Sequence, residues 1–292
     1  MVQSEASSPA APANVLPEFV CAEICGGNRP IDAPIELPGI RGWVFSQPCE
    51  GGRGGDIHYL SICSSGLIAR MCLADVAGHG SAVALVSGEI HRLLLRYMNR
   101  FDERRVLSDL NERLTTDPDA TMTTAVTASY FPPLRRLSLS YAGHPPAWLY
   151  RRPGDYWLRT PPLTARHRDR QLLDLPLAID PHTSFSRRQI HVEPGDRLLL
   201  VTDGVLEAPA PGGELYGEAR LAELLAQHRR DSTPVLARTI VDAVVAHTHD
   251  PGLPHDDVTL LLAEIVPGPP ALGVWELIKN RFLGRRRRIR AA

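Results

Sequence analysis

The sequence predicts an α+β fold in which mainly antiparallel sheets are covered by helices. Predicted strands come in runs, predicted helices are grouped between them, and strand and helix do not alternate regularly. This grouping is typical of α+β folds, whereas regular alternation would have predicted a doubly wound parallel sheet. The chain has 292 residues, of which 43% are hydrophobic, so it can bury a sizeable core.

The first predicted strands include a β-hairpin. After a strand-like segment at 43–45, two apolar runs at 57–63 and 67–76 are separated by a short turn that contains glycine. Two such runs around a short turn predict paired strands. Asp56 and Asp75 lie at the outer ends of this hairpin, and antiparallel pairing would place those ends side by side.

The remaining elements follow from periodicity. Apolar residues recur at helical spacing over 83–98 and 106–114, which predicts two helices. Further strands are then predicted at 121–131, 136–142, 147–151, 189–192 and 197–202. Two more helices, near 218–228 and 234–247, precede a last strand at 258–265.

The two ends of the chain differ in composition from the middle. Residues 1–40 are rich in Ala, Ser, Pro and Gly and are expected to be disordered or irregular. Residues 41–266 form the predicted folded domain, and residues 267–292 form a Pro-rich linker and a basic tail. The amino-terminal residues lack the charge and the apolar core of a signal peptide, so a cytoplasmic location is expected.

The charge is distributed unevenly. Residues 273–292 carry seven basic side chains and one acidic one, although the whole chain has a net charge of −1. The rest of the chain keeps 25 basic and 32 acidic residues, which leaves it at −7. This acidic body argues against nucleic acid as a partner.

The basic tail has a sequence of its own. Apolar side chains that can share one helical face precede a run of arginines; they are Val274, Trp275, Ile278, Phe282 and Leu283. Aromatic residues beside a cationic cluster suit an anionic membrane surface or an acidic partner, so peripheral membrane contact through 274–290 is one interpretation. A solubilising tail, or a helix docked on its own domain, is the alternative.

Four aspartates are the main candidates for a functional site. They end or border apolar runs, in the segments 54–56 (GGD), 73–80 (LADVAGHG), 199–204 (LLVTDG) and 255–259 (HDDVT). A carboxylate at the end of a buried strand is costly unless a cation meets it. Four such ends suggest one shared site, and oxygen ligands favour Mg²⁺ or Mn²⁺ over zinc.

Each segment also has a plain structural interpretation. The GGD segment could be a simple turn, and residues 75–80 could be a strand-to-helix turn capped by aspartate. Residues 202–204 could be a hairpin turn, since Asp-Gly is a common signal for one, and residues 255–257 could be a polar loop before a strand. His144, in a turn between predicted strands, is expected to be a structural loop histidine rather than a ligand.

Taken together, the motifs resemble a known family. Their order and spacing cover residues 42 to 266, and the matching segments are GGD (54–56), LADVAGHG (73–80), AGHPP (142–146), LPLAI (175–179), EPGDRLLLVTDGVLEA (193–208), GELYG (213–217) and DDVTLLL (256–262). The chain resembles the metal-dependent protein phosphatases of the PPM type, in their bacterial SpoIIE/RsbU-like branch. The resemblance implies a four-layer α-β-β-α sandwich with two metal ions at one edge of its sheets.

The resemblance also implies roles for individual residues. Asp75 would bridge two Mn²⁺ or Mg²⁺ ions, with the Val76 carbonyl as a further ligand. Asp56 would bind the second ion directly or lie just outside its ligands, and Asp75 and Asp56 are the expected catalytic pair. Asp203 and Asp256 would bind one ion. Residues expected to support the site are Asp257, His79 and Gly204.

The implied activity is direct hydrolysis of phosphoserine or phosphothreonine in a protein. The metals would activate a water that attacks phosphorus in line. The implied substrate is an anti-sigma-factor antagonist in a bacterial partner-switching pathway. The alternatives are a catalytically silent PPM-like regulator and a metal-dependent hydrolase of small phosphoesters. Because all four carboxylates are present, the enzyme is favoured over the silent regulator.

Overall fold

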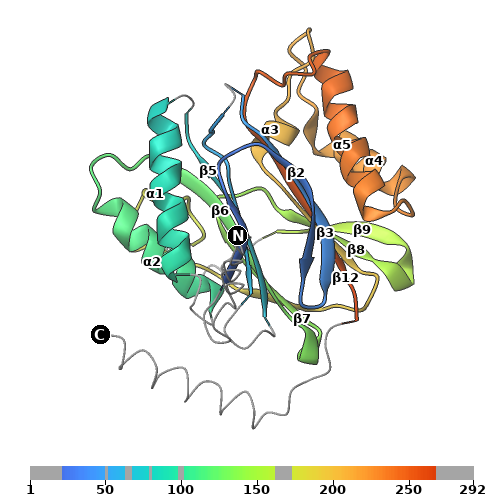
Figure 1. Ribbon diagram of the computed structural model, residues 1–292, viewed down its shortest axis with the longest axis horizontal. Helices are drawn as coiled ribbons and strands as arrows, with labels where there is room; N and C mark the ends of the chain where they lie inside the picture. The colour runs from blue at the N-terminus through green and yellow to red at the C-terminus, as the bar shows by residue number, and fades with distance from the viewer. Residues whose placement is uncertain are drawn as a thin grey trace, which may run out of the picture.

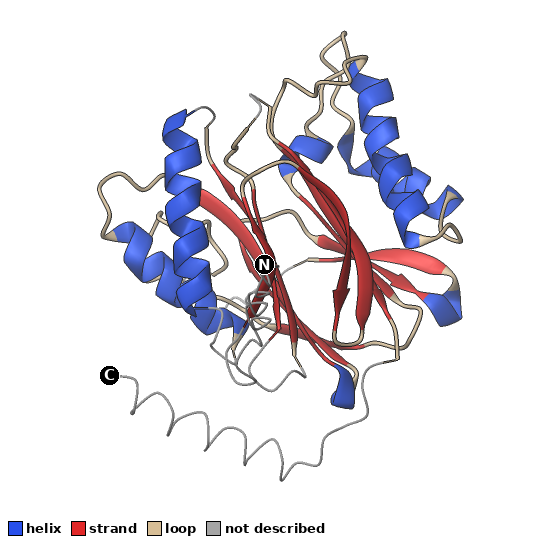
Figure 2. Ribbon diagram, viewed as in Figure 1, coloured by secondary structure: helices blue, strands red, loops and turns tan. Residues whose placement is uncertain are grey.

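The two sheets of the molecule pack face to face, with helices on both outer faces (Figures 1 and 2). The computed structural model describes residues 22–49, 52–62, 68–78, 81–97, 102–161 and 173–267. In these segments each sheet has six strands, and neighbouring strands are antiparallel. The predicted four-layer α-β-β-α sandwich is therefore confirmed.

The first sheet has the strand order β1-β4-β5-β6-β7-β10. Its strands are β1 (Ala22–Gly27), β4 (Ile57–Ile62), β5 (Ala69–Val76), β6 (Thr123–Phe131), β7 (Arg136–Ala142) and β10 (Arg188–His191). Helices α1 (Ser81–Tyr97) and α2 (Glu103–Thr115) cover its outer face. A short 3₁₀ helix, η1 (Pro132–Leu134), joins β6 to β7.

The second sheet has the strand order β2-β3-β12-β11-β8-β9. Its strands are β2 (Ile31–Leu37), β3 (Ile40–Gln47), β12 (Val258–Ile265), β11 (Arg197–Val201), β8 (Ala147–Arg151) and β9 (Tyr156–Thr160). The associated helices are η2 (Arg152–Gly154), α3 (Asp203–Leu206), α4 (Gly217–Gln227) and α5 (Thr233–Thr248). Figure 1 shows α4 and α5 on the outer face of this sheet.

Three apolar clusters hold the four layers together. Side chains alternate between the two faces of a strand, so Met71 and Leu73 of β5 face the second sheet while Cys72 faces α1 and α2. In β12, Leu261 likewise joins the cluster between the sheets, and Leu260 packs under α4 and α5. Both sheets are thus buried on both faces, which explains their nearly continuous apolar runs.

The hairpin predicted around Asp56 and Asp75 is confirmed. Strands β4 and β5 pair so that Ile57 lies opposite Ala74. Asp56 directly precedes this pair and Asp75 directly follows it, so the two carboxylates lie at the same end of neighbouring strands. Their side chains project from the face of the sheet that meets the second sheet, since they alternate with Ile57 and Ala74 of the outer cluster.

The prediction of an irregular segment over residues 1–40 is wrong for residues 22–37, which form β1 and β2. Both are edge strands, and Pro34 within β2 is tolerated there because an edge strand can leave one side unpaired. Ile35 and Leu37 nevertheless point into the core. The short strand β9 and the helix α3 were also missed.

Three sequence predictions fall outside the described residues. These are the assignment of His79, the interpretation of the basic tail at 274–290 and the disorder expected for residues 1–21. Within the parts of the chain that the structure describes, no helix combines the length and the hydropathy that crossing a membrane would need.

The inward face of β2 provides a test of its role. We expect Ile35→Ala to lower the free energy of unfolding by about 2–4 kcal/mol, because it removes buried methyl groups from the core between the sheets. Glu36→Ala, on the exposed face of the same strand, should change it by less than about 0.5 kcal/mol. Urea denaturation of both variants measures the difference, and equal effects would contradict the burial of β2.

Candidate functional site

The four candidate aspartates meet at one end of the gap between the two sheets. Asp56 directly precedes β4, and Asp75 lies near the end of β5. Asp203 begins α3 two residues after the end of β11, and Asp256 lies two residues before β12. Each belongs to a different element, and β11 and β12 are neighbours in the second sheet. The fold therefore brings together residues that are up to 200 positions apart.

The carboxylates lie close enough to affect one another's ionisation. Burial, followed by the charge of Asp75, raises the pKa of Asp56 well above its usual value. Burial and then the charges of Asp203 and Asp256 raise the pKa of Asp75 to about 7. Burial also raises the pKa of Asp203 and that of Asp256. A concentration of buried negative charge of this kind favours a bound cation.

The individual oxygen atoms support the same conclusion. Asp56 is 2% exposed, and its Oδ1 is buried without a hydrogen-bond partner among the described residues. Its Oδ2 accepts a hydrogen bond of 2.8 Å from Thr202 Oγ1.

In the described segments, no three acidic, histidine or cysteine side chains are grouped closely enough to enclose a metal ion. The aspartates form an open cluster, and its oxygen donors fit a hard divalent cation.

Asp257 holds the loop that carries Asp56. Its Oδ1 accepts a hydrogen bond of 2.8 Å from the Cys49 backbone N–H. Its Oδ2 accepts one from the Gly55 N–H and another, of 3.1 Å, from the Asp56 N–H. The buried carboxylate of Asp257, just before β12 of the second sheet, thus fixes the backbone of the GGD segment just before β4 of the first sheet.

Glycines are required where this backbone passes Asp257. A Cβ added to Gly54 would lie 2.1 Å from Asp257 Oδ2, and one added to Gly204 would lie 2.0 Å from the Asp257 carbonyl oxygen. Gly204 is further fixed because its carbonyl accepts a hydrogen bond of 2.8 Å from His255 Nε2. The hairpin turn considered for 202–204 is wrong, because Asp203 begins α3 instead.

Sequence reasoning missed Thr202, which is fully buried beneath the site. Besides donating to Asp56, its hydroxyl accepts a hydrogen bond of 3.0 Å from the Thr259 N–H. The Thr259 hydroxyl in turn lies 2.8 Å from that of Ser46. Thr202 directly precedes a candidate ligand in sequence, but nothing in the sequence showed that its partner would be Asp56.

Asn28 was missed as well, because it lies in the segment predicted to be irregular. Its Nδ2 donates to the Gly54 carbonyl (3.1 Å) and to the Ser87 hydroxyl of α1 (2.7 Å), and its carbonyl accepts from the Gly54 N–H (2.9 Å). The Ser87 hydroxyl also donates to the Gly54 carbonyl. The GGD loop is therefore tied to α1 as well as to Asp257.

Two further predicted residues can be placed. The Val76 carbonyl oxygen lies beside the GGD loop, 2.8 Å from the position that a Cβ on Gly55 would occupy. His144 is buried, and its Nδ1 donates to the Pro145 carbonyl (3.0 Å). Burial lowers the pKa of His144 to about 4, so its ring is neutral at pH 7. These contacts suit a structural histidine.

Comparison with known proteins identifies the family. Residues 69–266 match the family model of stage II sporulation protein E (SpoIIE), which covers more than half of the chain and three of the four aspartates. The chain belongs to the SpoIIE family. The resemblance to PPM-type phosphatases of the SpoIIE/RsbU-like branch is thereby confirmed.

Individual relatives agree with this assignment. The SpoIIE-family chain is 27% identical over 226 residues to the phosphoserine phosphatase RsbU of Bacillus subtilis, across 75% of this chain and 61% of RsbU. It spans between 39% and 61% of the length of the curated relatives that it matches.

Solved structures show the same fold. The RsbU and RsbW domains of Rv1364c from Mycobacterium tuberculosis align with a TM-score of 0.64 at 22% identity, across 84% of this chain and 64% of that one. RsbX in complex with magnesium aligns with a TM-score of 0.58 at 17% identity, across 80% of this chain and 100% of that one.

The raised pKa of Asp75 predicts a pH dependence for the metal-free chain. Between about pH 4 and pH 7 the folded chain retains a proton that the unfolded chain has lost, so stability should fall as the pH rises through this range. Asp75→Asn should remove this contribution. The stability of the variant relative to the wild type should therefore increase as the pH rises from about 4 to about 7. Urea midpoints in EDTA at pH 5 and pH 8 measure it, and parallel pH profiles for both proteins would contradict it.

The close packing of Gly204 provides a second prediction. Gly204→Ala should displace the Asp257 backbone and cost about 1–3 kcal/mol of stability, as overpacking of a tight contact does. Gly88→Ala in α1 is the matched control, since a Cβ there would have no neighbour within 4 Å and should stabilise the helix slightly. Thermal unfolding compares the two, and an equally mild effect at Gly204 would refute the packing argument.

Proposed function

We propose that this chain is a metal-dependent protein serine/threonine phosphatase that hydrolyses phosphoserine and phosphothreonine with two divalent cations, Mn²⁺ or Mg²⁺. The observation that carries the proposal is the convergence of four buried or half-buried aspartates at the end of the gap between the sheets, where burial, and then neighbouring carboxylates, raise the pKa of Asp56, Asp75 and Asp256. A cluster of this kind is destabilising by itself and becomes favourable when cations are bound.

The residues that would hold the cations follow from the placement of the donors. Asp75 and the Val76 carbonyl would contact the shared position, Asp203 and Asp256 would bind one ion, and Asp56 would serve the other. The magnesium complex of RsbX, which has the same fold, supports the choice of cation. Bound cations supply two things: a more acidic water and compensation for the charge of the transferred phosphoryl group.

The chain's own residues prepare this site. Asp257 and Thr202 fix Asp56 through its backbone and its side chain, so that one of its oxygens stays available. Gly78, with a φ of 108°, turns the chain from β5 towards α1. The amino end of α1 then follows the site directly, and backbone N–H groups at a helix start favour a phosphate.

The substrate proposal is a phosphorylated anti-sigma-factor antagonist in a partner-switching pathway. Similarity to the phosphoserine phosphatase RsbU supports it. A hydrolase of small phosphoesters would share the same cluster of carboxylates, and a silent regulator would not require it. Contact of residues 274–290 with an anionic membrane surface or an acidic partner stays a separate proposal.

The proposal is tested by activity on a phosphoserine peptide with Mn²⁺, with Mg²⁺ or with EDTA. We expect turnover that requires the cation and falls more than about 100-fold in Asp75→Asn, because even partners outside a metal's ligand set typically contribute 10–100-fold. Asp119→Asn, an exposed aspartate after α2, is the matched control and should keep full activity.

The outcomes separate the alternatives. A folded wild type that binds Mn²⁺ by calorimetry without turning over the peptide would favour the silent regulator. Turnover of nitrophenyl phosphate without turnover of phosphopeptides would favour the small-phosphoester hydrolase. The absence of cation binding would overturn the proposal altogether.

A further inference from the structure

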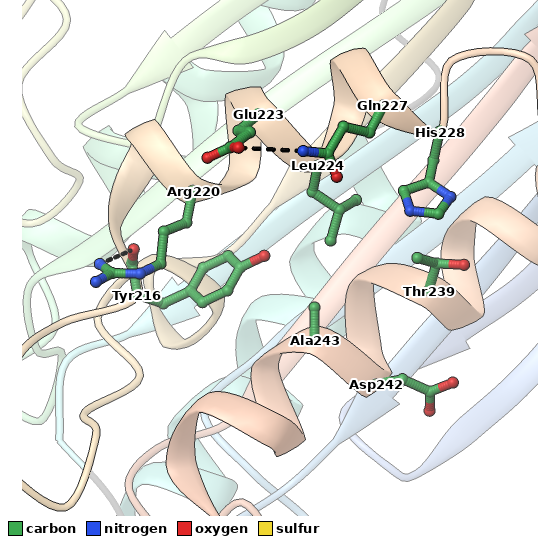
Figure 3. A pocket seen from close by; sticks show the side chains of 9 residues that line it. All are labelled: Tyr216, Arg220, Glu223, Leu224, Gln227, His228, Thr239, Asp242 and Ala243. Carbon is green, nitrogen blue, oxygen red and sulfur yellow. Dashed lines mark hydrogen bonds between the residues drawn. The ribbon is translucent and has the colours of Figure 1, made fainter.

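The outer helix layer of the second sheet contains a groove that the proposed phosphatase does not use. It lies between α4 and α5 and has a volume of about 490 Å³ (Figure 3). Tyr216, Leu224 and Ala243 supply apolar surface, while Glu223 of α4 and Asp242 of α5 project from the two sides. Val235, one turn before Thr239 on the same face of α5, extends this apolar surface and is 51% exposed.

The groove retains uncompensated negative charge. Its cationic groups already have partners, since Arg220 pairs with Glu214 at 2.7 Å and the His228 ring contacts Asp231 at 2.8 Å. Glu223 and Asp242 are exposed, and neither forms an ion pair within the described residues. The Glu223 carboxylate accepts only a hydrogen bond from Gln227 there. Apolar surface between two carboxylates that lack a cationic partner among the described residues suits a basic amphipathic segment.

Strand β12 contacts the start of α5 three residues before the described chain ends. Arg197 donates a hydrogen bond of 2.7 Å to the Asp231 carbonyl and pairs with Glu264 of β12 at 3.6 Å. Thr233, the first residue of α5, donates to the same Glu264 at 3.0 Å. The described chain ends at Pro267, three residues after Glu264, and the Val266 N–H donates a hydrogen bond of 2.9 Å to the Gly39 carbonyl. The following segment therefore begins at the turn between β2 and β3, within about 10 Å along the chain of the contact with α5.

The segment after Pro267 is both apolar and basic, as an occupant of this groove would need to be. Residues 274–290 place five apolar side chains at helical spacing and carry a net charge of +6. A 25-residue segment can reach about 80 Å when extended. The 11 residues of α4 make a helix of about 16 Å, so the segment is more than long enough to lie along the groove.

We propose that residues 274–290 dock in the groove between α4 and α5 of the same chain, with apolar side chains on Leu224 and Ala243 and arginines beside Glu223 and Asp242. The acidic partner of the basic tail is then this chain's own surface. The proposal is independent of the phosphatase assignment, because it involves no residue of the aspartate cluster.

Limited digestion of the full chain by chymotrypsin tests it, because Trp275 and Phe282 are cleavage sites within the tail. Glu223→Lys with Asp242→Lys should speed cleavage at these sites at least about fivefold, consistent with the loss of two surface ion pairs. The matched control is Glu112→Lys with Asp119→Lys, which changes the charge equally at exposed positions in and after α2 and should leave the rate unchanged.

A charge exchange makes the test specific. Replacing the four arginines at 285–288 by glutamate, in the chain that already carries Glu223→Lys and Asp242→Lys, should restore slow cleavage. Equal cleavage of the wild type and the groove variant would overturn the proposal, and so would an equal rise in the control. Protection that appears only with phosphatidylserine vesicles, and equally in the groove variant, would assign the tail to a membrane surface instead.

Discussion

Repulsion among buried carboxylates is the constraint on which the arrangement of this site depends. Asp56 and Asp75 lie at the ends of paired strands, and Asp203 and Asp256 approach them from the other sheet. Asp75 lies within β5, and the other three lie within two residues of the end of a strand that is buried on both faces. The large apolar clusters thus oppose the repulsion and hold the metal-free site in place.

Asp257 shows how the two sheets are joined at this end. Its carboxylate accepts three backbone hydrogen bonds from the segment between β3 and β4, so its negative charge serves to hold a loop. The neighbouring Asp256 accepts only one backbone hydrogen bond among the described residues, of 2.8 Å from the Asp257 N–H to its Oδ1, and its charge adds to the effect of burial in raising the pKa of Asp75 in the cluster. Adjacent acids in one motif therefore have different roles, because Asp257 holds the backbone of the GGD loop while Asp256 adds its charge to the cluster.

Much of this architecture could be predicted because its strands are long, apolar and regular. The pairing of β4 with β5 followed from two apolar runs around a short turn, and the meeting of Asp56 and Asp75 followed from that pairing. The edge strands could not be predicted in the same way, since Pro34 and neighbouring glycines resemble a loop. Contacts such as that of Thr202 with Asp56 join residues 146 positions apart and leave no local pattern.

The link between β1 and β2 has a practical consequence. The two strands belong to different sheets, and only residues 28–30 join them, at the same end of the sandwich as the aspartates. Asn28 within this link forms hydrogen bonds to both the GGD loop and α1. Tension applied to the amino-terminal side of β1 is therefore transmitted to the backbone beside Asp56. An affinity tag or a surface tether attached before β1 would therefore pull on the backbone beside Asp56.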